Sequence, residues 1–168
     1  NDGRDIPSEL DEEEDAEIVV ASDISDNDLK LQFWTNALPV IVDAFGGNST
    51  YSNVSPAPRS TLDGFVGISG VNLYCTMRLR KHTLSANIWI DVKDKEKNKR
   101  LFDVMYARKD NIEKHVPYNI GWNRGDDKRS STVNVEIEDV DFNDTSRWPE
   151  LTQFLATTCV ALKAELIT

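Results

Sequence analysis

Two aspartates and a lysine come nearest, by type and spacing, to a hydrolytic metal site. Asp91 and Lys93 share one face of a predicted strand, and Asp63 lies in an earlier predicted strand. Carboxylates and a lysine that meet at the end of a sheet can hold a divalent cation and activate water, as metal-dependent nucleases require. Asp63 precedes a glycine, however, and the first predicted helix offers no strong acidic partner. Short Asp-x-Lys matches also arise by chance on charged strand ends, so both interpretations stay open.

Basic residues form the better candidate for ligand binding. Five of them lie between residues 93 and 100, at the start of a predicted helix, where a helix N-terminus favours anions. Others lie near the tip of the preceding predicted hairpin. Interleaved acids such as Asp94 and Glu96 weaken the field, so an ordinary solvated surface remains the alternative. The candidate nucleic-acid-binding residues are Arg78, Arg80, Lys81, Trp89, Lys97, Lys99 and Arg100.

Histidines and cysteines give no sign of a metal centre. His82 and His115 have no cysteine or carboxylate at zinc-ligand spacing. Cys75 and Cys159 both fall on predicted apolar faces, which favours free, buried thiols over a disulfide framework. We therefore expect no cofactor, and a divalent cation only if the nuclease interpretation holds.

The element that positions most of these residues is a predicted antiparallel hairpin over residues 71–92. Odd positions from Val71 to Leu79 are apolar, and the apolar positions from Leu84 to Val92 have the opposite parity. A turn near His82 brings both apolar sets onto one sheet face. The other face then carries Tyr74, Arg78 and Trp89. We interpret the two aromatic rings as packing under a helix, with a nucleic-acid-binding surface as the alternative.

Helical and strand patterns flank this hairpin. A helix is expected from residues 26–28 to 45, capped by Asp26 or Asp28 and kinked or divided by Pro39. A first strand is expected over residues 62–69, one helix over 94–116, strands over 118–122 and 133–137 with a bulge near Asp139, and a last helix after 144–146. The order α-β-β-β-α-β-β-α predicts an α+β fold, in which a mainly antiparallel sheet of about five strands is covered by three helices.

The net negative charge of the chain comes from its first 26 residues. The formal net charge is −10, and residues 1–26 hold eleven acids and one arginine, whereas residues 27–168 hold 18 acids and 18 bases. We expect an acidic linker or tail over 1–26 and a single domain over 27–168. The opposite charges raise the hypothesis that this tail folds back on the basic residues. The chain starts with Asn, has no signal peptide and lacks an apolar run of membrane-spanning length. We expect a cytoplasmic fragment of a longer protein, with no membrane contact.

Several short segments resemble a bacterial family known as a domain of unknown function, and the resemblance extends over residues 28–167. The resemblance implies a position behind a restriction-endonuclease-like nuclease domain or in a defence-associated protein, and it implies no catalytic residues. The matching segments are Leu31-Gln32-Phe33-Trp34, the hairpin from Val71 to Val92, Leu101-Phe102-Asp103, Lys109 with Ile112 and Glu113, Ile120-Gly121-Trp122 and Trp148.

Three functions follow as hypotheses. The first is a non-catalytic accessory module of a larger bacterial nuclease or defence protein, supporting contacts with DNA or with another protein. The second is a metal-dependent nuclease that uses Asp63, Asp91 and Lys93. The third is an assembly domain that binds a partner subunit. The expected partners are an upstream domain of the same polypeptide and either DNA or a partner subunit.

Overall fold

The computed structural model describes residues 25–47 and 50–167. The acidic segment expected over residues 1–26 therefore lies almost wholly outside the described residues. The elements in chain order are α2 (Asp26–Ala44), β1 (Thr61–Phe65), β2 (Val71–Arg78), β3 (Thr83–Ile90), α3 (Lys95–Tyr106), α4 (Lys109–His115), β4 (Ile120–Asn123), β5 (Ser131–Ile137), a short 3₁₀ helix (Thr145–Arg147) and α5 (Trp148–Leu166).

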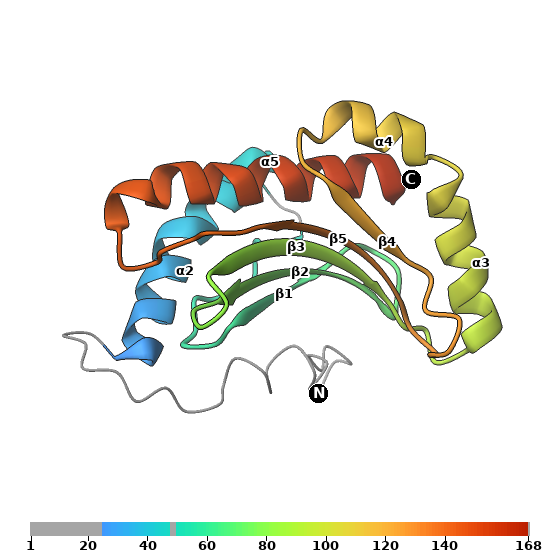
Figure 1. The fold of residues 1–168 in the computed structure, drawn as a ribbon, viewed down its shortest axis with the longest axis horizontal. Helices are drawn as coiled ribbons and strands as arrows, with labels where there is room; N and C mark the ends of the chain where they lie inside the picture. Colours follow the sequence, from blue (N-terminus) through green and yellow to red (C-terminus); the bar gives the residue numbers. More distant parts are fainter. Residues whose placement is uncertain (1–24, 48–49, 168) are drawn as a thin grey trace.

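The five strands form one antiparallel sheet in the order β1-β2-β3-β5-β4. Figure 1 shows this sheet as an arch, with α5 lying along its convex side and α3 at one end. Among the described residues four α-helices accompany the sheet, one more than the sequence predicts. The α+β class is confirmed, and so is an antiparallel sheet of five strands.

The predicted hairpin is confirmed in register and in parity. Leu73 lies opposite Ile88, and Cys75 lies opposite Ala86. All four side chains are fully buried on the convex face, under α5. His82 adopts a positive φ of 56° in the turn, a conformation that lets so short a connection reverse the chain. Burial of each Leu or Ile side chain stabilises the fold by roughly 1.5–3 kcal/mol, which explains why this register dominates.

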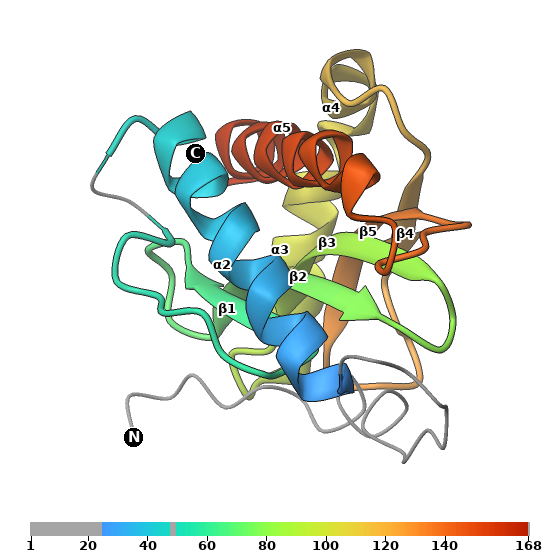
Figure 2. The ribbon, with the colours of Figure 1, turned by 90° about the vertical axis from the view of Figure 1, so that its left-hand side faces the viewer.

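Helices α2 and α5 close the apolar side of the sheet by packing on each other. Figure 2 shows α2 running from beside α5 down one end of the molecule. Phe33 contacts Trp34, Phe142 and Trp148 edge-on, with ring centroids 5.2, 5.2 and 5.4 Å away. Trp34 donates its indole N–H to the carbonyl of Arg59 at 2.7 Å, so the buried ring leaves no polar atom unsatisfied.

The first helix departs from its prediction in two ways. Ser25 caps it, because its Oγ accepts from the backbone N–H of Asp28 at 3.1 Å, so the expected Asp26 or Asp28 cap is wrong. Pro39 does not divide the helix, which continues to Ala44. The buried apolar side of α2 packs on α5, and this packing stabilises the helix although Pro39 lacks a backbone N–H to donate. Gly46, with φ of 80°, follows the end of the helix and turns the chain away.

The helix predicted over residues 94–116 is two helices. Asp94 caps α3, accepting from the N–H of Lys97 at 3.1 Å. The axis then breaks at Ala107 and Arg108, and α4 packs against α5 while α3 stays at the end of the sheet. Phe102 and Ile112 are both buried, but against different neighbours. Two separate packing surfaces therefore replace the single apolar stripe that the sequence suggests.

Smaller differences occur at strand ends. β1 stops at Phe65 instead of residue 69, because Gly67 and Gly70 take positive φ values of 95° and 85° and turn the chain. The expected bulge near Asp139 is a left-handed residue, with φ of 58°, placed after β5 ends at Ile137. Asp144 precedes the last helix as expected and accepts from the N–H of Ser146. No helix in the described part of the chain is both long and apolar enough to cross a membrane.

Candidate nucleic-acid interface

The concave face of the sheet carries an aromatic row that crosses three strands. Phe65 of β1 lies opposite Asn72 of β2, which in turn lies opposite Trp89 of β3. Residues opposite each other in a sheet point to the same face, so the two rings flank the Asn72 amide about 10 Å apart, two strand spacings. Phe65 is 47% exposed, and Trp89 is half-buried. An exposed ring on a polar sheet face is an uncommon use of phenylalanine.

Tyr74 lies beside this row on the same sheet face. Its ring meets the Trp89 ring edge-on, with centroids 6.3 Å apart and planes inclined by 63°. Tyr74 is only 2% exposed, so it fixes the position of Trp89 and does not offer a free ring face. The helices of the described residues lie on the convex side or at the ends of the sheet. The interpretation that a helix covers Tyr74 and Trp89 is therefore wrong for the described part of the chain.

Amide side chains lie on the same sheet face as the two rings. Asn72 donates its Nδ2 to Oδ1 of Asp63 at 2.7 Å, and Asn87 donates to Oγ of Ser85 at 3.1 Å. Both amides are largely buried, and Asn134 of β5 lies opposite Asn87. Side-chain contacts hold these amides in place, and exposed fractions of 8% for Asn72 and 7% for Asn87 leave little of either side chain open to a ligand.

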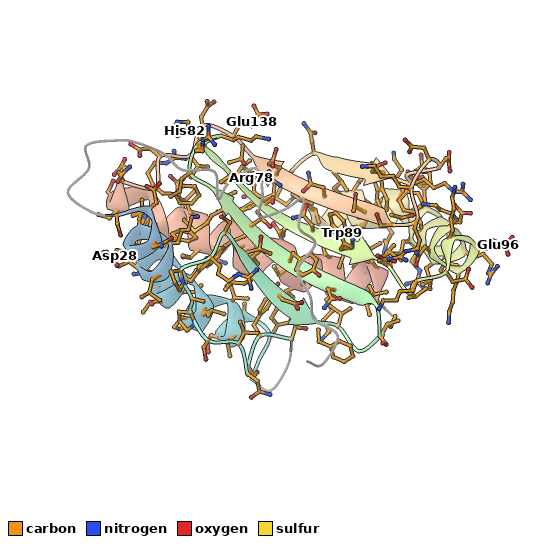
Figure 3. All side chains as sticks on the ribbon, turned by 90° about the horizontal axis from the view of Figure 1, so that it is seen from below. Asp28, Arg78, His82, Trp89, Glu96 and Glu138 are labelled. Atoms are coloured by element: carbon orange, nitrogen blue, oxygen red, sulfur yellow. The ribbon has the colours of Figure 1, made fainter. Side chains whose placement is uncertain are left out.

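The basic candidates lie at opposite ends of this face. Arg78 ends β2 beside the hairpin turn, and Arg80 and Lys81 follow within it. Lys97 and Arg100 belong to α3, beyond the far end of β3. Figure 3 shows Arg78 and His82 towards one end, Glu96 of α3 at the other, and Trp89 between them. β3 has eight residues, so the two basic groups are separated by about 26 Å, with the aromatic row between them.

Lys99 is the exception, because its ammonium faces inward. Nζ donates to the carbonyl oxygens of Arg124, Gly125 and Ser130 at 2.6, 2.7 and 2.8 Å, and lies 3.1 Å from Oγ of Ser131. Burial lowers the pKa of Lys99, and the charge of Lys95 lowers it further. The ammonium binds the turn between β4 and β5, so Lys99 does not belong to the interface.

The three catalytic candidates are not brought together. Asp63 of β1 lies level with Asn87 of β3, two strands away. Asp91 lies four residues further along the chain, just after β3 ends. The corresponding backbone separation is roughly 16 Å, too far for both carboxylates to hold one cation. Asp91 instead pairs with Arg129, and Lys93 donates its backbone N–H to Asp91 at 3.2 Å. Within residues 25–47 and 50–167 no group of three His, Cys, Asp or Glu side chains is arranged to hold a metal ion.

The histidines and cysteines take structural positions. His82 lies at the hairpin turn, with Nδ1 3.3 Å from the carbonyl of Val140. His115 ends α4, with Nδ1 3.4 Å from Oε1 of Glu165. Cys75 and Cys159 are free and fully buried, as expected, with their sulfur atoms 3.4 Å apart between β2 and α5.

A family model for the domain of unknown function DUF4268 matches residues 29–167. The chain belongs to the DUF4268 family. The match spans every described element from Leu29 in α2 to the end of α5, so the arched sheet and its helices constitute the DUF4268 fold in this chain. Searches of curated proteins and of solved structures found no significant match.

Sequence reasoning missed Phe65 as a member of this interface. The available signal was its place after Asp63 in a strand with period-two alternation, which puts Phe65 on the polar face. An aromatic residue two positions from an aspartate in the same strand points to the same face as that aspartate, and is therefore expected to point away from the core. The remaining candidates on this face, Trp89 and the hairpin bases, were found from the same periodicity.

Proposed function

We propose that this DUF4268 domain is a non-catalytic accessory module that contacts nucleic acid through the concave face of its sheet. The observation that carries the proposal is the cross-sheet row in which Phe65 and Trp89 flank Asn72. Single-stranded nucleic acids bind to proteins mainly by stacking bases on aromatic rings. Two rings in one row across the sheet supply such platforms without the need for a helix in a groove.

The charges at the two ends of the face support the same use. A strand laid along the arch would meet Arg78, Arg80 and Lys81 at the hairpin end, and Lys97 and Arg100 at the α3 end. Phosphate contacts at both ends would fix its direction, while the rings between them hold bases. The described domain is near neutral overall, so we expect modest affinity with a small salt slope rather than tight binding to long duplexes.

The nuclease alternative receives less support from the geometry. Its carboxylates are two strands apart, and the Asp91 carboxylate is occupied by Arg129. The proposed setting is a larger bacterial nuclease or defence protein, in which an upstream domain of the same polypeptide performs the chemistry. This setting rests on the resemblance described above. Two free thiols in contact fit a reducing compartment, so we propose a cytoplasmic location.

Fluorescence anisotropy with labelled oligothymidine and with a labelled duplex tests the proposal. Phe65→Ala removes an exposed ring and should weaken oligothymidine binding by roughly tenfold, with a comparable loss for Trp89→Leu. Tyr118→Ala is the matched control, because Tyr118 is 37% exposed but lies in the loop between α4 and β4, away from the concave face. It should bind like the wild type.

Three outcomes separate the hypotheses. Equal affinity of the Phe65 and Trp89 variants and the wild type would exclude the concave face as the interface. Failure of the wild type to bind either oligonucleotide at low salt would favour the assembly-domain alternative. Magnesium-dependent cleavage of the duplex that Asp91→Ala abolishes would favour the nuclease alternative.

A further inference from the structure

The strand β5 extends further than the edge strand that pairs with it. Ile120 of β4 lies opposite Val135, and β4 begins there, whereas β5 continues through Glu136 and Ile137. On their other side these two residues pair with Ser85 and Leu84 of β3. Within the described ranges no strand pairs with residues 136 and 137 on the β4 side. The outer margin of β5 is therefore open for a length of at least two residues.

A pocket of about 620 Å³ lies at this open margin. Its walls are Glu113 of α4, residues 116–119 of the loop that leads to β4, Ile120, and Glu136 and Ile137 of β5. Tyr118 stands at one wall, held by an edge-on contact with Phe154 at 4.8 Å. The pocket therefore combines a strand margin with one aromatic wall that is held in place.

Charge within the pocket has one sign. Glu113 and Glu136 both line it, and no basic side chain does. Glu113 accepts from the indole N–H of Trp122 at 3.3 Å and lies 3.2 Å from Nζ of Lys109, which partly balances it. Glu136 makes no hydrogen bond or ion pair with any residue in 25–47 or 50–167. A carboxylate beside an aromatic ring suits the long aliphatic stem and cationic head of an arginine or lysine.

We propose that an extended segment of a partner protein adds to the outer margin of β5, in line with β4, and places a basic side chain in this pocket. Main-chain hydrogen bonds to an open strand margin supply affinity, and pockets for alternate side chains supply specificity. Glu136 points to the concave face and Ile137 to the convex face, since they lie opposite Ser85 and Leu84. The segment therefore alternates basic and apolar residues, with the basic one beside Glu136.

The test uses the full chain and three synthetic peptides. The first is acetyl-Thr-Val-Arg-Val-Thr-amide, the second carries citrulline in place of arginine, and the third carries N-methyl groups that block strand pairing. In amide NMR titrations the arginine peptide should shift residues 120 and 136–138 selectively. The citrulline peptide should bind about tenfold more weakly, because it keeps the shape but lacks the charge. The N-methylated peptide should not bind.

Two variants make the result decisive. Glu136→Gln should weaken the arginine peptide by about tenfold and leave the citrulline peptide unchanged. Glu138→Gln is the control, since Glu138 is an exposed acid two residues further on that does not line the pocket. Equal affinity for the arginine and citrulline peptides, shifts that avoid residues 136–138, or no binding at millimolar peptide would each overturn the proposal. Binding that survives N-methylation would overturn the strand-addition geometry.

Discussion

Asp91 and Arg129 meet in a two-point contact, with Nε 2.8 Å from Oδ1 and Nη2 2.9 Å from Oδ2. Asp91 follows β3 and Arg129 lies in the turn before β5, so the contact joins two neighbouring strand ends. Burial alone would raise the pKa of Asp91. The guanidinium and the N–H of Lys93 outweigh that effect and hold the pKa below its usual range.

This contact predicts a pH-dependent loss of stability. Asp91→Asn should lower the free energy of unfolding by about 1 kcal/mol at neutral pH, because the partly exposed pair loses its charge. The lowered pKa means that the contribution is complete above the usual aspartate pKa and disappears as pH falls through the native value. Urea unfolding at pH 7 and at about pH 3 should therefore show a difference that shrinks on acidification. Glu96→Gln, at an exposed pair with Arg100, should change little at either pH.

Replacing Lys99 should destabilise the fold strongly, although most lysines can be replaced with little effect on stability. Lys99→Met should lower the free energy of unfolding by about 3 kcal/mol, because three carbonyl oxygens in the β4–β5 turn lose their donor. Thermal and urea unfolding measure this loss. Lys97→Met, two positions earlier on the exposed side of α3, is the control and should stay within about 0.5 kcal/mol. Similar losses in both variants would contradict the structural role assigned to Lys99.

Gly64 of β1 lies so close to Thr50 and Tyr51 that a larger residue at this position should clash with them. A Cβ at Gly64 would lie 2.5 Å from Cγ2 of Thr50 and 2.6 Å from Cζ of Tyr51. Tyr51 cannot yield easily, because it is fully buried and donates its hydroxyl to the carbonyl of Leu73 at 2.5 Å. Gly64→Ala should therefore cost about 2 kcal/mol in urea unfolding. Gly121→Ala, where the nearest atom is 3.6 Å away, should be nearly neutral, and equal costs would refute the clash.

The two thiols predict low reactivity in the native state. The hydrogen bond with Cys75 and complete burial raise the pKa of Cys159 well above its usual value, so thiolate is scarce. Ellman's reagent at pH 8 should modify neither cysteine in the folded chain and both after denaturation. Rapid modification of the native protein would mean that α5 separates from β2 more often than this packing allows.

Local patterning predicted the hairpin because both of its strands obey the same rule. Period-two alternation placed Leu73 and Ile88 on one face, and the structure pairs them directly. The break between α3 and α4 was not predictable in this way. Met105 and Ile112 are two turns apart and read as one stripe, but the sheet end and α5 are separate surfaces that only the tertiary fold defines.

The composition of the candidate site depends on contacts between residues far apart in the sequence. Asp63 and Asp91 read as neighbours because both flank predicted strands, and their separation depends on strand order and register, which residue types do not encode. Lys99 read as a surface base because lysine is rarely buried. Its inward position follows from the β4–β5 turn, which lies 25 or more residues away in sequence. Trp89 was identified correctly as a residue of the polar face.

The packing of α5 on α2 and on the hairpin has a consequence during synthesis. The apolar surface of Leu73 and Ile88 is complete once residue 90 has been made, but the helix that covers it ends at Leu166. A ribosome-bound chain therefore exposes the apolar face of an incomplete sheet until residue 166 has left the ribosome. Chaperone demand should accordingly persist until α5 has been made, and truncations that remove α5 should aggregate rather than fold.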